Sequence, residues 1–284
     1  MKVRIILNYL VGFIISLLIS LTAIVLISKY TIFDKDYLMD VLDKDNYYDK
    51  VYNEIQEEME NDIMPSGFTN DIIKDTFTKE EVKDDIILFI NNTYEGKITK
   101  LDKGSLKEKI NNNINDFLTK SNLKITDKTG VDNFLNDLVK VYQNEICLYS
   151  YVDGLVNTFY KLSNIINKVI IISLIILFTL IIISKLLLKF NYLSSSVLAS
   201  GLIILFIRLF IYERIDANYL LIITDIFSNI LTIVINKIGN YLFYIGIELV
   251  IVGMMFSCQV FIKKCQFKNN KRQNIAKKKL DVYN

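Results

Sequence analysis

The chain has 284 residues, of which 52% are hydrophobic, with a mean hydropathy of +0.32 and a net charge of +2. This hydrophobic content exceeds what one soluble core usually needs and indicates a membrane protein. The chain has no histidine, which excludes general-base catalysis, metal ligation and catalytic triads that depend on imidazole. Its three cysteines form no CxxC motif, so we expect no metal site, no cofactor and no enzymatic activity.

The first predicted element is a membrane span that follows a short basic start. Lys2 and Arg4 precede residues 5–28, which carry no charge. A run of this length is enough for a tilted transmembrane helix. A cleaved signal peptide is the alternative, but its apolar region is only about 7–15 residues long and ends at a small-x-small site. We therefore expect an uncleaved anchor.

Residues 29–165 have the composition of a water-facing domain. They hold 17 lysines and 26 acidic residues, a net charge of −9. Thr78 with Glu81, and Ser105 with Glu108, each fit a capping box that begins a helix. Apolar residues recur at helical spacing after both boxes and again after residue 131, and an earlier helix should stop near residues 65–67. The segment is therefore predicted to be an acidic, mainly helical domain.

Three further apolar runs complete the predicted membrane region. The expected fold class is an all-α membrane protein with four transmembrane helices, a mainly helical extracytoplasmic domain and an interfacial amphipathic helix. The predicted division is residues 1–28 for the cytoplasmic start and first span, 29–165 for the domain, 166–189, 190–212 and 238–262 for the later spans, 213–237 for the interfacial helix and 263–284 for a basic tail.

The positive-inside rule orients these spans. The tail holds eight basic residues and one acid, and the start and the turn at 185–189 are also basic. Four spans place all three on the cytoplasmic side, with both termini inside and residues 29–165 outside. Residues 213–237 are the ambiguous part, because 219–235 could form a fifth span. That would move the basic tail outside, and the polar residues of this segment share one helical face, so an interfacial helix is favoured.

Two intramembrane charges suggest an ion pair. Arg208 and Glu248 lie about 6 and 10 Å below the predicted outer ends of their helices. An unpaired charge at mid-bilayer costs at least about 2.5 kcal/mol, so pairing is the natural resolution. The pair is predicted to be structural, and a role in an ion or proton pathway is the functional alternative.

Small residues predict close helix packing in the same region. Gly239, Gly246 and Gly253 recur every seven residues on one face of the last span, with Ser257 one turn further. Gly201 and its neighbouring serines and alanine offer a similar surface on the third span.

Other candidate sites are weaker. Five aspartates between residues 34 and 45 could attract a divalent cation, but they lack the glycine and terminal glutamate of a calcium loop and are predicted to form a solvated face. Asp84 and Asp85 are adjacent, so their carboxylates are expected to diverge on a helix. Cys147 could cross-link a dimer or be a buried thiol. The oligomeric state is left open.

A resemblance covers most of the chain. The segments NYYDKVY (46–52), KEEVKDDI (79–86) and YEGK (94–97), followed by LD (101–102) and LKEKI (106–110), are similar to those of uncharacterised bacterial multi-pass membrane proteins that have an extracytoplasmic helical domain after the first span. This resemblance implies an architecture and a cell-membrane location, and it implies no activity.

Two functional classes follow. The favoured one is a non-enzymatic cell-envelope protein whose outside domain binds a partner or ligand as a sensor, adaptor or scaffold. The other is a transporter or channel component that uses Arg208 and Glu248. The expected partners are the lipid bilayer, anionic lipids at the basic tail and an envelope protein, with no nucleic acid.

Overall fold

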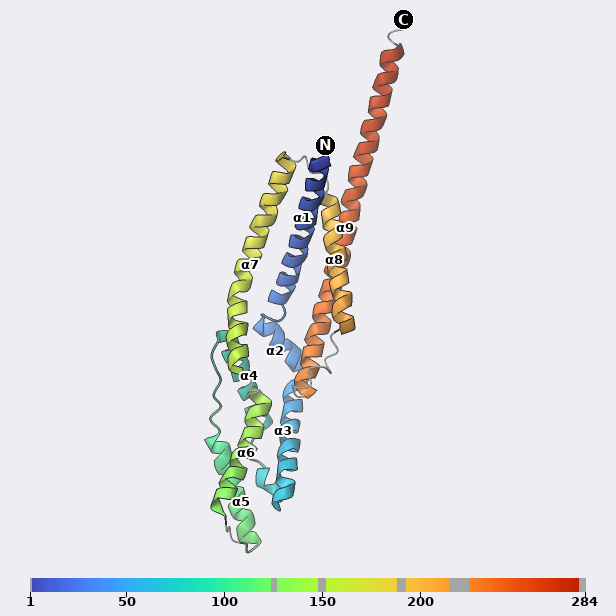
Figure 1. Cartoon of the computed structure of the whole chain (residues 1–284). Coiled ribbons are helices and arrows are strands. Elements are labelled where there is room, and N and C mark those ends of the chain that lie inside the picture. The colour runs from blue at the N-terminus through green and yellow to red at the C-terminus, as the bar shows by residue number, and fades with distance from the viewer. Residues whose placement is uncertain (1, 124–126, 148–151, 188–192, 215–224, 281–284) are drawn as a thin grey trace. The chain divides into compact units, whose positions relative to one another are not determined.

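The computed structural model describes residues 2–123, 127–147, 152–187, 193–214 and 225–280 (Figure 1). All regular elements in these ranges are helices, and no β-strand occurs among them. The chain divides into two compact units. The bundle unit comprises residues 1–28, 166–216 and 235–284, and the helical unit comprises residues 29–165 and 217–234.

Long helices build the bundle unit. Their bounds are Lys2–Lys29 for α1, Val152–Leu187 for α7, Leu193–Arg214 for α8 and Asp225–Leu280 for α9. The first residues of α7 and α9 belong to the helical unit. Among the described residues, four stretches are long and apolar enough to cross a membrane: Ile6–Lys29, Val156–Lys185, Leu193–Phe210 and Thr232–Ile262. The prediction of an all-α chain with four candidate spans is confirmed, and this fits a multi-pass membrane protein.

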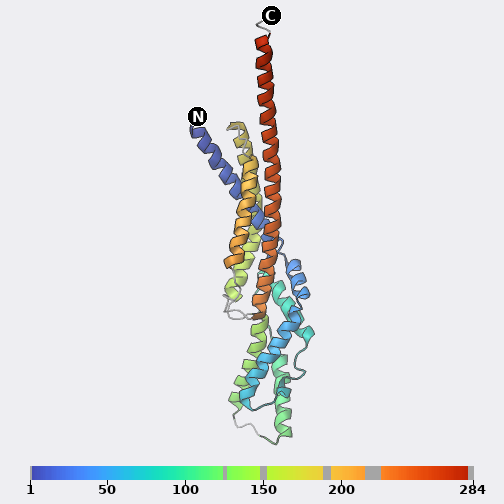
Figure 2. The same cartoon turned by 90° about the vertical axis from the view of Figure 1, so that its right-hand side faces the viewer.

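Apolar contacts and hydroxyl groups join the helices of the bundle unit. Ile27, Ile204 and Leu242 form a buried cluster that brings α1, α8 and α9 together. The Ser20 hydroxyl lies 3.2 Å from the Ser200 carbonyl oxygen, and the Thr22 hydroxyl donates to that of Ser173 over 3.0 Å. Figure 2 shows α8 running alongside α9. Because lipid is as apolar as the side chains, such hydroxyl contacts and close packing hold spans together.

Helix α9 includes part of the predicted interfacial segment. Residues 215–224, within the predicted 213–237 helix, lie outside the described residues. From Asp225 onward α9 is one continuous helix through Leu280. The second part of the predicted interfacial segment and the predicted last span therefore share one helix.

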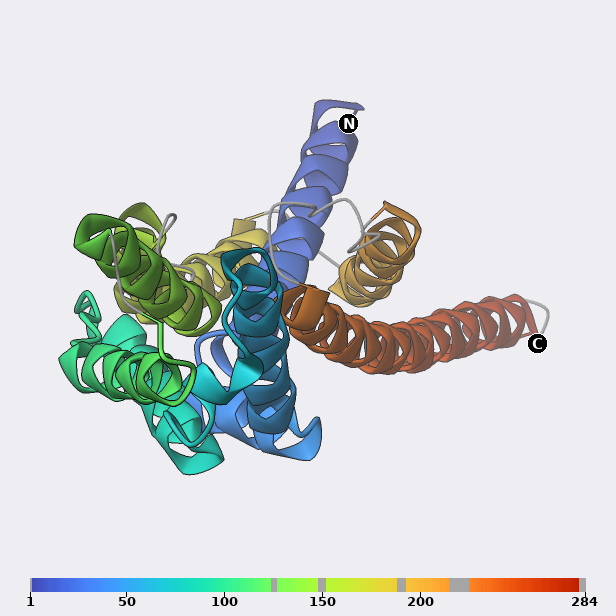
Figure 3. The ribbon, with the colours of Figure 1, turned by 90° about the horizontal axis from the view of Figure 1, so that it is seen from below.

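The helical unit consists of shorter elements. Their bounds are Lys35–Lys44 for α2, Tyr47–Ile63 for α3, Met64–Ser66 for η1, Asn70–Ile73 for η2, Lys79–Glu95 for α4, Gly104–Lys120 for α5 and Lys128–Cys147 for α6. The end-on view in Figure 3 shows these helices gathered together. Their core is formed by fully buried residues at the predicted helical spacing, including Ile55, Met59, Ile110, Ile114 and Leu138.

The helix α3 ends where the sequence predicts. α3 stops at Ile63, and Pro65 lies in η1, which ends before a left-handed Gly67 with φ of 79°. This is the predicted stop. Continuity between α6 and α7 depends on residues 148–151, which lie outside the described residues. Gly154 lies inside α7.

The capping box at Thr78 is confirmed. The Glu81 amide donates to the Thr78 hydroxyl over 3.1 Å, and the Thr78 amide donates to the Glu81 carboxylate over 2.9 Å. Each side chain satisfies a backbone donor at the start of α4. We expect Thr78→Ala to lower the free energy of unfolding by about 1 kcal/mol, measured by chemical denaturation of the full chain. Thr119→Ala, on the exposed surface near the end of α5, is the control, and an equal loss there would contradict a specific capping role.

The second predicted box, at Ser105, is wrong. α5 begins at Gly104, its N-cap is Lys103, and no side chain caps it from that position. The Asp102 carboxylate instead accepts from the Gly104 amide over 3.0 Å. Because Asp102 supplies an acceptor earlier in the chain, the helix starts before Ser105.

Candidate functional site in the helical unit

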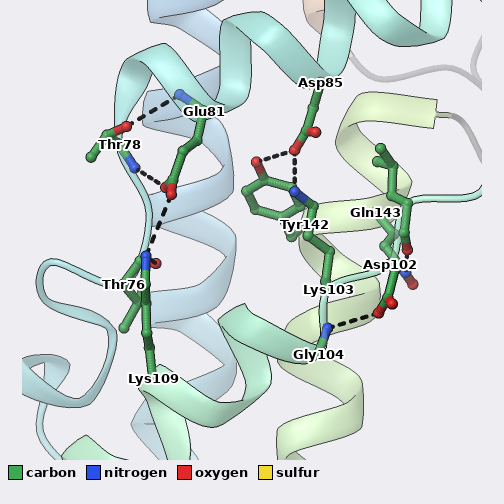
Figure 4. Close-up of polar contacts among 11 residues, drawn as sticks. Thr76, Thr78, Glu81, Asp85, Asp102, Lys103, Gly104, Lys109, Tyr142 and Gln143 are labelled. Carbon is green, nitrogen blue, oxygen red and sulfur yellow. Dashed lines mark hydrogen bonds and ion pairs between the residues drawn. The ribbon is translucent and has the colours of Figure 1, made fainter.

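A buried polar cluster joins the helices α4, α5 and α6 (Figure 4). Asp85 lies in the first half of α4, between the buried residues Val82 and Ile86. Lys103 is the N-cap of α5, and Tyr142 lies on α6. The apolar sides of α4 and α6 pack together, and this packing brings the carboxylate and the phenol within reach of each other.

One carboxylate oxygen of Asp85 contacts both Tyr142 and Lys103. The Tyr142 hydroxyl donates to it over 2.7 Å, and the Lys103 ammonium forms an ion pair with the same atom. The Lys103 nitrogen also lies 4.8 Å from the centroid of the Tyr142 ring. The side chains of Asp85 and Lys103 are each only 16% exposed, and Tyr142 is 1% exposed. Charge-assisted bonds in such a shielded place are stronger than surface pairs.

Backbone groups around this cluster are held by neighbouring side chains. The Gln143 amide donates to the Leu101 carbonyl over 2.7 Å, which fixes the segment before α5 against α6. Lys109 donates to the Thr76 carbonyl over 3.0 Å and lies 3.4 Å from the Glu81 carboxylate. Together these contacts tie the beginning of α4, the connection to α5 and the middle of α6 (Figure 4). The cluster therefore acts as a clamp on three helices.

A second polar feature lies where α6 packs on α3. Glu145 is 8% exposed, and its pKa is raised to about 8 by burial and by the nearby carboxylates of Glu58 and Glu54. Burial and the neighbouring Asp62 raise the pKa of Glu58. Burial, followed by Glu145 and Glu54, raises the pKa of the Tyr47 phenol. Several acidic groups thus share one helix interface, and Glu145 is the most enclosed carboxyl recorded there.

The predicted intramembrane charges lie on α8 and α9. The Arg208 guanidinium lies over the Phe243 ring, 5.3 Å from its centroid, and the Glu248 side chain is exposed. Gly246 faces α8, and Glu248 lies about 200° around α9 from Gly246. A pair with Arg208 would therefore require a rotation of α9, and the ion pair stays a prediction.

Three of the predicted small residues lie where α8 and α9 approach each other closely. A Cβ atom added at Gly201 would lie 2.7 Å from the Gly246 carbonyl oxygen, and one added at Gly253 would lie 2.6 Å from the Leu198 amide nitrogen. At Gly239 it would meet nothing within 4 Å. The Ser257 hydroxyl donates to the Gly253 carbonyl of its own helix over 2.8 Å. The backbones of α8 and α9 therefore touch at Gly201, Gly246 and Gly253.

Four of the five aspartates between residues 34 and 45 have recorded partners. Asp34 caps α2 by accepting from the Tyr37 amide over 3.1 Å, and lysines pair with Asp40, Asp43 and Asp45. No group of three or more His, Cys, Asp or Glu side chains within the described ranges is arranged to hold a metal ion. The side chain of Cys147 lies outside the described residues, so its state stays a prediction.

The sequence pattern indicates neither the clamp nor the buried Glu145. It predicts only that Asp85 diverges from Asp84, and the apolar spacing after residue 131 does not identify Tyr142 as a polar partner. The sequence does contain one signal. Asp85 follows Val82 by three residues and precedes Ile86, so it lies beside the buried face of α4, where a charged side chain needs a partner. The identity of that partner depends on tertiary packing.

The fold and its polar features define a class of helical protein with four candidate membrane spans and a separate helical unit. In comparisons with known proteins, no family model, no curated protein and no solved structure matches the chain.

Proposed function

We propose that this chain is a non-enzymatic cell-envelope membrane protein whose helical unit binds a protein partner or ligand outside the cytoplasm. The observation that carries the proposal is the separateness of this unit. Residues 29–165 have a net charge of −9, their helices have a buried core of their own, and residues 30–155 lie between two candidate membrane spans. A compact acidic domain anchored on both sides is a suitable platform for binding, as a sensor, adaptor or scaffold.

The charge distribution supports the orientation of this proposal. The tail after the last candidate span holds eight basic residues, and the connection near Lys185 and Lys189 is also basic. Placing these in the cytoplasm puts the helical unit on the other side. The basic tail then meets anionic headgroups of the inner leaflet. The clamp at Asp85 ties α4, α5 and α6 together, and preorganisation of this kind lowers the ordering cost of binding.

The orientation is tested by labelling single cysteines with a membrane-impermeant maleimide in intact bacterial cells. In a cysteine-free background, Ser66→Cys places an exposed thiol in η1, and Gln266→Cys places one near the start of the tail. We expect Ser66→Cys to be labelled in intact cells and Gln266→Cys only after lysis. The reverse result would overturn the proposal.

The binding role is tested by photo-crosslinking from the helical unit and from the α8 span. A photoreactive residue is placed at exposed positions of the helical unit, such as Asn53 and Glu57, with Phe206 in the α8 span as the matched control. We expect discrete adducts only from the helical unit. Adducts only from Phe206 would move the binding role to the bundle unit.

A further inference from the structure

Glu145 occupies an unusual position for a carboxyl group. It is 8% exposed on α6, and the acidic groups of α3 that act on it are Glu58 and Glu54. Glu54 and Glu58 are one turn apart, so both side chains project from the same side of α3. None of the ion pairs recorded within the described ranges includes Glu145, and no hydrogen bond to it is recorded there.

The other helices that contact α6 do not bring a cation to Glu145. The charged groups that reach α6 from α4 and α5 are Asp85 and Lys103, at Tyr142, and Lys107, at Asp132 and Asn136. The recorded contacts of Lys103 are with Asp85 and the Tyr142 ring, and those of Lys107 are with Asp132 and Asn136, so neither ammonium is recorded at Glu145. The charged groups recorded as acting on Glu145 across the interface between α3 and α6 are therefore acidic.

An ionised Glu145 is unfavourable in this interface for two reasons. Burial removes the water that would stabilise the carboxylate, and the carboxylates of Glu58 and Glu54 repel it. The protonated form escapes both penalties and fits between the helices as a small polar group. The packed arrangement of α6 on α3 therefore belongs to the protonated form.

We propose that Glu145 is a proton-controlled latch: while its carboxyl is protonated α6 stays packed on α3, and loss of the proton loosens this helix pair. The inference goes beyond the proposed function, because it names a stimulus to which the helical unit responds. It rests on the interface itself and holds for either orientation of the unit in the membrane.

The raised pKa fixes the direction of the pH dependence. The carboxyl has an ordinary pKa of 4.5 and one of about 8 in the folded chain. Between these values the folded state keeps a proton that the unfolded state has lost, so stability falls as pH rises. The protonated carboxyl makes its full contribution to folding stability below its ordinary pKa of 4.5. This contribution is lost as pH rises from 4.5 to the folded pKa of about 8.

The latch is tested by the distance between spin labels at Asn53→Cys on α3 and Asn144→Cys on α6, both exposed positions. The full chain is used in lipid nanodiscs, with its native cysteines replaced. We expect one short distance at pH 6 and a longer, broader distribution at pH 9.5, both chosen to bracket the folded pKa of about 8. Glu145→Gln should keep the short distance at both pH values.

Two exposed glutamates on α3 supply the matched variants. The midpoint of the transition is the pH at which half of the distance change has occurred. Glu58→Gln removes one repelling charge and should lower this midpoint by about 0.5 pH unit or more. Glu57→Gln, the same change one residue earlier, should leave the midpoint in place. An unchanged distance in the native chain, or an equal pH response in Glu145→Gln, would overturn the latch. If Glu145→Gln does not fold, an unmoved midpoint in Glu58→Gln overturns it.

Discussion

Gly253→Ala is expected to push α8 and α9 apart and to lower the stability of the bundle unit by about 2 kcal/mol or more. A Cβ at this position would lie 2.6 Å from the Leu198 amide nitrogen and 2.7 Å from its Cα. Both atoms belong to a helical backbone, which cannot rotate away as a side chain can. The helices must therefore separate, and the loss of contact spreads to Gly246 and Gly201 on the same seam.

Gly239→Ala is the matched control in the same helix. A Cβ there would meet nothing within 4 Å, and alanine favours a helix over glycine by up to about 1 kcal/mol. We expect this variant to be neutral or slightly stabilising. The measurement is unfolding of the full chain in mixed micelles, followed by circular dichroism. Equal losses in the two variants would show that α8 and α9 do not touch at Gly253.

The seven-residue glycine spacing predicted the packing face of α9 but not its extent. Gly253 meets Leu198, and Gly246 meets Leu205, so the two helices run antiparallel. The same register places Gly239 level with residue 212, close to the end of α8 at Arg214. Sequence spacing reports which residues share a face. It does not report how far along that face a neighbouring helix extends.

Whether Arg208 and Glu248 meet depends on the register of α8 against α9 and on the angle of each helix about its axis. The contacts of Gly253 with Leu198 and of Gly246 with Leu205 place Arg208 level with Phe243, over whose ring its guanidinium lies, and Glu248 level with residue 203. Counting residues from the predicted ends of two helices contains neither the register nor the angle, so the ion pair stays a prediction.

Local signals in the helical unit were reliable where nothing competed with them. Thr78 and Glu81 cap α4 as expected, whereas Asp102 provides an earlier acceptor at the start of α5 and overrides Ser105. Apolar periodicity located the core, including Ile55 and Ile110. The pairing of Asp85 with Lys103 and Tyr142 joins three separate helices, and no local pattern contains that information.

Lys103→Met is expected to lower the free energy of unfolding of the helical unit by about 3 kcal/mol. The substitution keeps most of the side-chain volume but removes the cation, so Asp85 is left as a shielded carboxylate with Tyr142 as its remaining recorded partner. Chemical denaturation of the full chain in nanodiscs, followed by the near-ultraviolet signal of the tyrosines, measures the loss. Lys44→Met is the control, because the pair of Lys44 with Asp40 is 67% and 51% exposed and is expected to contribute less than about 1 kcal/mol.

The double variant Lys103→Met with Asp85→Asn separates the charge from the packing. Asparagine keeps an acceptor for the Tyr142 hydroxyl but carries no charge, so the cost of an uncompensated carboxylate disappears. We expect the double variant to recover at least half of the stability that Lys103→Met loses. If Lys103→Met costs no more than Lys44→Met, the three-helix clamp contributes nothing to stability. If the single variant is costly and the double variant recovers nothing, Lys103 acts through its positive charge over the Tyr142 ring, and the ion pair is secondary.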